Sequence, residues 1–365
     1  MGITGLYALL KKQAPNAIEL VPPSKLSGKV MAIDASQTVH KYVRGILGGG
    51  NTISTKRGEF TAHIMAIVNK TLFYVRQRIL PLYVFDGGSH AHKGDTLDKR
   101  RDIREASTSA AAKFKFEDWM TDDVKRVLNF MGIPWVQAKG EADPECARFT
   151  RESHKSRKSD KTRKALAYAV VSDDGDMLTY GARRMIRDLD SNSEGVTVIT
   201  LSRVLSGLGM NMKQFIDLCI LMGCDYIPTV KGVGPVGAMR IIKSEPSITK
   251  WAKESGQDPK WIKRFLETRD IFTKSPTTDP DTVRAVWKRP DYDGLNKYLK
   301  KKGFATPQTK CDALRQSYDG WRRSILNKGK ESDDKVSRKS QSSNGSKRKK
   351  TYHVEDDTYD VGAVA

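Results

Sequence analysis

The sequence predicts an α/β fold with a mainly parallel sheet, and two observations support it. Short β-rich apolar runs alternate with segments of helical periodicity, which is typical of parallel sheets with helical crossovers. After about residue 210 the pattern becomes helical. With 365 residues, 38% of them hydrophobic, the chain is long enough for one large domain or two smaller ones with a sizeable core.

Five apolar runs are the expected strands. They are "KVMAIDAS" (29–36), "PLYVFDGG" (81–88), "IPWVQA" (133–138), "AYAVVSDD" (167–174) and "VTVITL" (196–201). Helices are expected between them, as in 62–79, and again at 212–223, because apolar residues recur there at helical spacing. The same spacing at the N-terminus predicts a helix whose core face carries Ile3, Leu6, Leu9 and Leu10.

The chain is strongly basic. Its 64 Lys and Arg residues against 43 Asp and Glu residues give a formal net charge of +21. Residues 328–365 contribute only +2, so +19 lies on residues 1–327. A folded body of this charge predicts a polyanionic partner, first of all nucleic acid, with a charge that serves solubility alone as the alternative.

Cysteine spacing and hydropathy exclude several classes of protein. The four cysteines show no CxxC spacing, which argues against a zinc site or a disulfide framework and fits a reducing compartment. No apolar run approaches the roughly 20 residues that span a bilayer, and the N-terminus lacks a signal-peptide layout. No membrane association is therefore expected.

Acidic residues stand where three of the expected strands end. Asp34 ends "VMAID", Asp86 ends "LYVFD", and three aspartates at 173, 174 and 176 follow "AVVS". Because α/β sheets bind ligands at the carboxyl ends of their strands, we expect these acids to converge. Acids at two helix ends join them, and the candidate ligands are Asp34, Asp86, Glu141, Asp143, Asp174, Asp176 and Asp225.

A single acid of this kind has a structural alternative, since an Asp after a strand is most often a helix N-cap or a turn residue. Seven of them in a strongly basic protein point instead to hard divalent cations, which prefer carboxylate oxygens. Two such ions about 4 Å apart can hold both the attacking and the leaving oxygen of a phosphodiester. The acids therefore predict a site for Mg²⁺ or Mn²⁺.

Six motifs that follow one another along the chain carry a resemblance to a known family. They are "MGITGLYALL", "VMAIDAS", "YVFDGG", "KGEADPECA", "SDDGDMLTYG" and "LCILMGCDYIPTVKGVGPVGA". Together they resemble the flap structure-specific 5′ nucleases over about residues 1–270. The resemblance implies a metal-dependent phosphodiesterase for branched DNA, with a PIN-like domain, a helical arch and a helix–two-turn–helix element.

The implied organisation has four parts. An N-terminal nuclease region covers 1–105 with the arch at about 88–118, and an internal nuclease region covers 119–228 with a basic loop at 151–164. The helix–two-turn–helix and a helical C-terminal part cover 229–327. Residues 328–365 are expected to form a disordered tail of basic and acidic residues.

The resemblance also assigns the acids to two metal ions. Asp34, Asp86, Glu141 and Asp143 would hold the first ion. Asp174, Asp176 and Asp225 would hold the second, with Asp143 as a shared candidate. Asp173 aligns outside the ligand set, as a turn or supporting residue. Asp143 departs from the family pattern, because the family usually has Glu at this position.

Lys93 and Arg100 are implied to act on the scissile phosphate from the arch. They lie seven residues apart and so share a helix face. Two cations there would stabilise the extra charge of the transition state, whereas an ordinary solvated face is the alternative. Arg104 is a further candidate phosphate contact. Gly2 would place the free N-terminus near the active site once Met1 is removed.

A glycine-rich stretch, "TVKGVGPVGAMRII" (229–242), opens a helix, and backbone N–H groups at such a turn can bind a phosphate. In the family this is the helix–two-turn–helix element, which grips duplex backbone, often with a monovalent cation such as K⁺. Val236 and Gly237 stand where the family tends to carry basic residues. The implied DNA contacts are Lys231, Gly232, Gly234 and Arg240, with Thr61 at a one-nucleotide 3′ flap and His40 stacking on a base.

The leading hypothesis is a Mg²⁺-dependent 5′ flap endonuclease, with 5′–3′ exonuclease activity beside it, that acts as a monomer in DNA replication and repair. Its partner would be double-stranded DNA with a single-stranded 5′ flap. The alternatives are a sister nuclease, exonucleolytic or bubble- or junction-cutting, and a non-catalytic scaffold that binds branched DNA.

The C-terminal tail bears on location and on protein partners. "SKRKK" (346–350) is typical of nuclear import signals, so the nucleus, or a site of viral DNA replication, is expected. The glutamine-led, aromatic-ended motif with which family tails bind a sliding clamp is not visible. Clamp binding is therefore left open.

Overall fold

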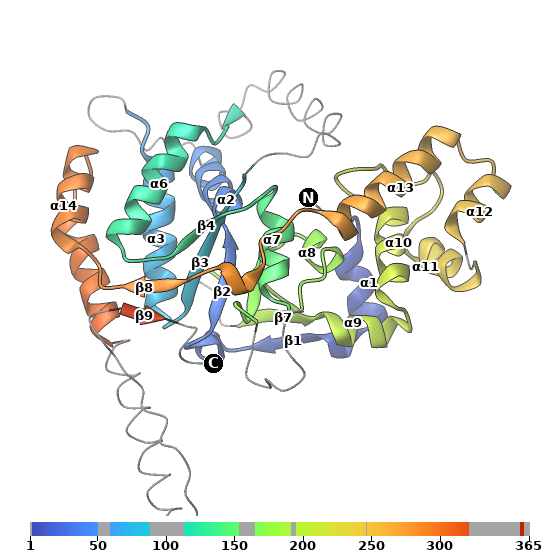
Figure 1. The fold of residues 1–365 in the computed structure, drawn as a ribbon, viewed down its shortest axis with the longest axis horizontal. Helices are drawn as coiled ribbons and strands as arrows, with labels where there is room; N and C mark the ends of the chain where they lie inside the picture. Colours follow the sequence, from blue (N-terminus) through green and yellow to red (C-terminus); the bar gives the residue numbers. More distant parts are fainter. Residues whose placement is uncertain are drawn as a thin grey trace, which may run out of the picture.

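The computed structural model describes residues 2–49, 59–87, 113–152, 165–190, 195–245, 247–320 and 358–360. A twisted sheet occupies the centre of the molecule, and helices pack on both of its faces (Figure 1). The expected α/β fold is confirmed. Within the described ranges, no helix combines the length and the apolar character needed to cross a bilayer.

Seven strands form the sheet in the order β1-β7-β6-β5-β2-β3-β4. Strands β6, β5, β2, β3 and β4 are parallel, whereas β7 is antiparallel to β6 and β1 is antiparallel to β7. The sheet is therefore mainly parallel, as predicted. The bounds are β1 (Ile18–Val21), β2 (Val30–Asp34), β3 (Leu80–Phe85), β4 (Trp135–Gln137), β5 (Ala169–Val171), β6 (Arg184–Arg187) and β7 (Val196–Thr200).

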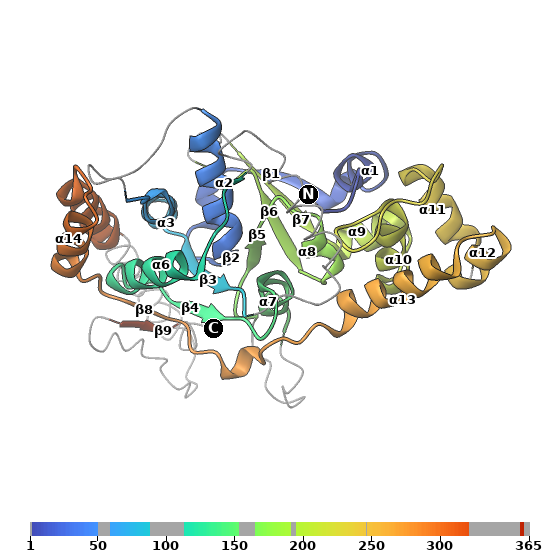
Figure 2. The same ribbon diagram turned by 90° about the horizontal axis from the view of Figure 1, so that it is seen from above.

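Helices flank this sheet on both sides. Figure 2 shows α2 (Ala35–Gly48) and α3 (Ala62–Arg76) on one face, and α7 (Ala142–Phe149) and α8 (Asp176–Thr179) on the other. The remaining helices are α1 (Leu6–Gln13), α6 (Asp118–Phe130), α9 (Leu201–Leu208), α10 (Met212–Met222), α11 (Pro235–Ser244), α12 (Ile248–Glu254), α13 (Pro259–Lys274), α14 (Tyr292–Lys301) and a helix over 307–320. Short 3₁₀ turns cover Pro15–Ala17, Pro23–Leu26 and Pro280–Thr282.

The core lies around the two central parallel strands. All six residues of β3 are buried, and in β2 every residue except Asp34 is buried. Parallel strands covered on both faces read as unbroken apolar runs, which is why their positions were predictable. The apolar face expected at the N-terminus is also confirmed, because Leu6, Leu9 and Leu10 of α1 are buried.

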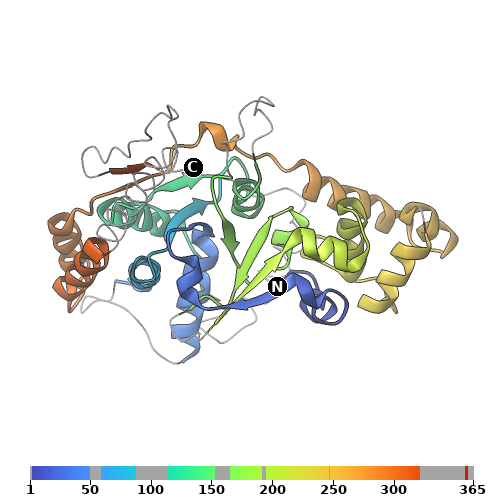
Figure 3. The same cartoon turned by 90° about the horizontal axis from the view of Figure 1, so that it is seen from below.

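The long axis of the molecule ends in helices on both sides of the sheet. Helices α11, α12 and α13 lie at one end and α14 at the other (Figures 1 and 3). At the first end, Arg269 of α13 holds the buried Asp217 of α10 through two hydrogen bonds of 2.7 and 2.8 Å. At the other end, Asp123 of α6 accepts hydrogen bonds from Tyr298 and Lys302 in the α14 region.

A two-stranded sheet was not expected in the C-terminal half. Strand β8 (Val286–Lys288) pairs in antiparallel fashion with β9 (Thr358–Asp360). Residues 358–360 therefore form a strand, where the composition of the tail predicted disorder. The rest of the predicted tail after residue 328, including 346–350, lies outside the described residues.

Candidate metal-dependent active site

Three acids lie at one edge of the sheet because three neighbouring strands run in the same direction. Strand β2 lies between β5 and β3, and all three are parallel. Asp34 is the last residue of β2, Asp86 follows β3, and Asp174 lies in the turn after β5. The chain moves from β2 to β3 on one side and later to β5 on the other. Such a reversal of strand order is where α/β sheets bind ligands.

The start of α7 adds two more acids to this edge. Glu141 is the N-cap of α7, and Asp143 lies in its first turn. The helix packs against β2, β3 and β5. Its first N–H, that of Ala142, donates to Asp86 Oδ1 at 2.9 Å, while Ser36 Oγ donates to Asp86 Oδ2 at 2.9 Å. Both oxygens of Asp86 are therefore held in place.

A buried thiol shows that these acids converge. Cys146 of α7 is fully buried, and its pKa lies well above the usual range, first because of burial and then because of neighbouring negative charges. Three of the charges belong to Asp34, Asp86 and Asp143. Acids from two strand ends and one helix start thus surround the same point.

A second group of acids lies at the ends of α8 and α10. Asp176 begins α8, is 4% exposed, and donates its backbone N–H to Asp174 Oδ1 at 3.0 Å. Asp225 follows the end of α10. Burial raises the pKa of Cys224 to about 12, and the charges of Asp176 and Asp225 act in the same direction. Asp176 therefore lies near Cys224, the residue that precedes Asp225, and α8 packs against α10.

Tyr226 joins the two groups. Its hydroxyl donates to Glu141 Oε2 at 3.1 Å and lies 2.5 Å from the hydroxyl of Tyr180. Burial raises its pKa, and Glu141, Asp176 and Asp143 raise it further. Tyr226 was not among the site residues predicted from the sequence. Its one sequence signal is a tyrosine directly after a candidate ligand.

The chemistry of these donors fits a hard cation. Among the described residues, no three His, Cys, Asp or Glu side chains already stand in the arrangement of a metal site. The candidate donors are nevertheless all carboxylates, and the nearby thiols of Cys146, Cys219 and Cys224 have raised pKa values because they are buried. Hard divalent cations prefer carboxylate oxygens, so the donor set suits Mg²⁺ or Mn²⁺.

The N-terminal segment lies against the second group. Gly2 has a φ of 98°, and a Cβ at this position would stand 2.0 Å from Asp174 Oδ1. Any other residue would therefore clash with Asp174 as well as strain the backbone. The structure thus places Gly2 at the candidate site, as expected, while its role in the reaction stays a prediction.

The glycine-rich turn forms an exposed helix start. Gly234 is the N-cap of α11, and Pro235 is its first residue. Gly232 has a φ of 79°, a left-handed conformation that favours glycine. The side chains of Lys231 and Arg240 are exposed on either side of this turn. A phosphate could therefore approach the backbone here, but the DNA contact and the K⁺ site stay predictions.

Two predicted DNA contacts have little free surface. Thr61 is 4% exposed and precedes α3. His40 packs edge-on against Phe114, with ring centroids 5.3 Å apart. Base stacking by His40 and a 3′ flap at Thr61 both stay predictions. Lys93, Arg100 and Arg104, most of the arch at 88–118 and most of the loop at 151–164 lie outside the described residues.

Comparisons with known proteins identify two family regions in the chain. The XPG N-terminal domain matches residues 1–107, and the XPG I-region matches residues 132–225. Flap endonuclease 1 of Lodderomyces elongisporus is 33% identical over 342 residues, and the alignment covers 86% of each chain.

Two solved structures resemble the chain over most of its length. Flap endonuclease-1 from Methanococcus jannaschii is 28% identical with a TM-score of 0.62, over 83% of this chain and 96% of that one. The catalytic core of Rad2 in complex with DNA substrate is 21% identical with a TM-score of 0.67, over 87% of this chain and 100% of that one, which shows a shared fold. From its paired XPG regions and its flap endonuclease 1 relatives, this chain belongs to the XPG-type family of flap structure-specific 5′ nucleases.

Proposed function

We propose that the chain is a metal-dependent, structure-specific 5′ flap endonuclease. It hydrolyses a phosphodiester of branched DNA at the junction between single and double strands, as a monomer, in DNA replication and repair. The observation that carries the proposal is the convergence of acids at one edge of the sheet, where the Ala142 N–H donates to Asp86 and the Tyr226 hydroxyl donates to Glu141. A strongly basic protein, with a net charge of +21, has no evident structural need for such a cluster.

Two Mg²⁺ ions, or Mn²⁺ in their place, would be held by these acids. Asp34, Asp86, Glu141 and Asp143 would hold the first, and Asp174, Asp176 and Asp225 the second. When bound, the ions would supply a hydroxide at neutral pH and offset the charge that develops on the phosphate.

The chain itself keeps the carboxylates in position. Ala142 N–H and Ser36 Oγ hold Asp86, Gln37 N–H donates to Asp34 Oδ1 at 2.9 Å, and Tyr226 holds Glu141. Each contact reduces the freedom of one carboxylate before substrate arrives, which is how preorganised sites lower a barrier. Lys93 and Arg100 would add positive charge on the substrate side.

DNA would be recognised through its backbone. The turn with Lys231, Gly232 and Gly234, with Arg240 after it and a K⁺ ion beside it, would contact the duplex. Contacts to phosphates carry no base sequence, so cleavage should depend on DNA shape and decline steeply with salt. The basic run at 346–350 supports a nuclear location, whereas nothing in the described chain supports clamp binding.

Cleavage of a labelled 5′-flap substrate with Mg²⁺ tests the proposal. We expect cleavage near the junction, no cleavage with chelator, and a loss of at least about 100-fold in Asp86→Ala and Asp174→Ala with DNA binding retained. Asp270→Asn, at an exposed ion pair on α13, is the control and should cleave normally.

Two results would redirect the proposal. Tight binding of the flap without cleavage would contradict it in favour of a scaffold. A parallel panel of nick, gap, bubble and four-way junction would reveal a sister nuclease or an exonuclease, if one of those substrates were cut faster than the flap.

A further inference from the structure

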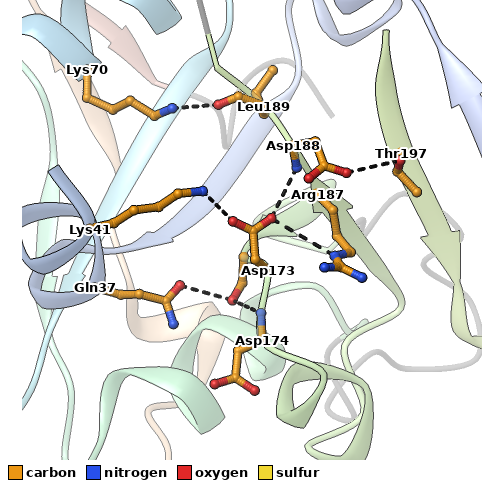
Figure 4. A network of polar contacts seen from close by, with 10 residues as sticks. Gln37, Lys41, Lys70, Asp173, Asp174, Arg187, Asp188, Leu189 and Thr197 are labelled. Atoms are coloured by element: carbon orange, nitrogen blue, oxygen red, sulfur yellow. Dashed lines mark hydrogen bonds and ion pairs between the residues drawn. The ribbon is translucent and has the colours of Figure 1, made fainter. Parts of the chain in front are cut away.

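The turn that carries Asp174 is held by contacts with other elements and not by its own strand, β5. Strand β5 ends at Val171. The Ser172 N–H still donates to the Ile186 carbonyl of β6 at 3.0 Å, whereas residues 173–175 lie outside any strand. In this turn the side chains of Asp173 and Asp174 point in opposite directions, with Asp173 directed toward Lys41 and Arg187 (Figure 4). The contacts of Asp173 therefore bear on how Asp174 is presented.

Asp173 is held on three sides. Lys41 of α2 forms an ion pair with Asp173 Oδ2, the Asp188 N–H donates to Oδ1 at 3.1 Å, and Arg187 Nε lies 4.0 Å from Oδ1. The carboxylate is thus anchored to both α2 and the end of β6.

The segment that follows β6 is itself supported. Asp188 has a φ of 59°, unusual for a residue with a side chain, and Thr197 Oγ1 donates to Asp188 Oδ2 at 3.3 Å. Lys70 of α3 donates to the carbonyl of Leu189 at 2.5 Å (Figure 4). Asp173 therefore binds to a segment that β7 and α3 keep in place.

A second set of bonds connects the turn to Asp34. The Asp174 N–H donates to Ser172 Oγ at 3.0 Å, and Ser172 Oγ donates to Gln37 Oε1 at 3.0 Å. The Gln37 N–H donates to Asp34 Oδ1 at 2.9 Å. Gln37 thus links an acid of the first group to the backbone of an acid of the second.

Helix α2 combines both sets of contacts. It begins at Asp34, and Gln37 and Lys41 lie four residues apart on one of its faces. We propose that Lys41 and Asp173 are a positioning pair, which fixes Asp174 relative to Asp34 and so sets the spacing of the two metal-binding groups. This inference rests on the proposed function.

The alternative is that Lys41 and Asp173 form an ordinary surface ion pair with no effect on the site. The side chain of Lys41 is 70% exposed, and exposed pairs contribute little to stability. Here, however, the carboxylate also accepts a backbone N–H, and its neighbour in sequence is a candidate ligand. We therefore expect the pair to affect metal binding and catalysis while leaving stability nearly unchanged.

Lys41→Met and Asp173→Asn in the full chain test the pair. We expect Mn²⁺ affinity, measured without DNA from the electron paramagnetic resonance signal of free Mn²⁺, to fall about 10-fold, as for residues that orient metal ligands. The kcat on a flap substrate should fall by a similar factor, with KM and the thermal midpoint unchanged. Lys41→Arg should keep the Mn²⁺ affinity and the kcat at their wild-type values.

Arg203→Met is the matched control. It breaks another ion pair between two elements, Arg203 of α9 with Glu19 of β1 at 3.4 Å, away from the acids. All values should stay at wild-type levels. If Asp173→Asn does not fold, Lys41→Met still tests the positioning pair, because the Lys41 side chain is mostly exposed and its replacement should not affect folding.

The outcomes separate the two proposals. A wild-type protein that neither cleaves flaps nor binds Mn²⁺ contradicts the proposed function. A wild type that does both, with Lys41→Met and Asp173→Asn indistinguishable from Arg203→Met, overturns the positioning pair alone. A loss of DNA affinity in Lys41→Met with unchanged Mn²⁺ affinity also overturns it, because Lys41 would then be a phosphate contact.

Discussion

The Tyr226→Phe substitution removes one hydroxyl between the two groups of acids and leaves the ring in place. Tyr226 is 3% exposed, and its hydroxyl donates to Glu141 Oε2 at 3.1 Å. Its backbone carbonyl accepts a hydrogen bond from Arg264 Nε of α13 at 2.7 Å, so the backbone should stay fixed. The substitution therefore removes the hydrogen bond to Glu141, together with the contact to the Tyr180 hydroxyl at 2.5 Å, and leaves the backbone in place.

The size of the effect follows from the kind of bond. A hydrogen bond to a charged group contributes about 1.5–3 kcal/mol net. If the loss of this bond raises the activation free energy by the same amount, the rate falls about 10- to 100-fold, since about 1.4 kcal/mol corresponds to a factor of ten. The free energy of unfolding should fall by about 1–3 kcal/mol.

Single-turnover cleavage of a 5′-flap substrate over a range of Mg²⁺ concentrations measures this effect. Tyr298→Phe is the matched control, because it removes another buried hydroxyl that donates to a carboxylate, Asp123 Oδ1 at 2.6 Å. Both variants should lose similar stability, but only Tyr226→Phe should lose rate. Equal rates for the two variants would refute the reasoning.

Three further predictions concern other parts of the molecule. Arg269→Met leaves Asp217, whose side chain is 8% exposed, without its bidentate partner. The free energy of unfolding, measured in urea, should therefore fall by about 3 kcal/mol. This is the lower end for a broken buried pair, because the Arg269 side chain is itself 21% exposed. Burial lowers the pKa of His63 below its ordinary value of 6.5, although the hydrogen bond that its ring donates to Asp123 opposes this. Below about pH 6.5 the unfolded chain therefore binds a proton that the folded chain does not, and the thermal midpoint should fall as pH decreases from 7 to 5.5. Gly2→Ala should displace Asp174, because its Cβ would stand 2.0 Å from Oδ1, and slow cleavage about 100-fold, as misplacements near 1 Å can.

Each of these predictions has its own control. Arg269→Met combined with Asp217→Leu should recover part of the lost stability, since the buried charge is then gone. His63→Gln should flatten the pH dependence of the midpoint. Gly45→Ala, with no atom within 4 Å of the new Cβ, should cleave normally. A full rate in Gly2→Ala would mean that the N-terminal segment is not part of the site.

Local pattern was enough to predict the main strands and the acids at their ends. Strands β2 and β3 are buried on both faces, so their residues form continuous apolar runs that stop at Asp34 and Asp86. Helix α10 was predictable from the helical spacing of its apolar residues, and seven of its eleven residues are apolar and buried. In these elements the residues that decide the structure are neighbours in sequence.

Two short strands, β6 and β1, were not predictable in this way. Strand β6, "RMIR", is four residues long and begins and ends with arginine, and β1, "IELV", exposes its two central residues. Neither run has a local pattern that distinguishes it from a loop. Both exist because they pair with β7, which lies elsewhere in the sequence.

The sequence by itself determined the α/β class, the strand ends and the set of seven acids. Each of these features depends on residues that are neighbours in sequence, such as an apolar run and the carboxylate that ends it. The tertiary structure alone decided which side chains hold those acids. Tyr226 and Glu141 lie 85 positions apart, and Lys41 and Asp173 lie 132 apart. Contacts over such separations depend on the order in which strands and helices pack, and no local spacing encodes that order.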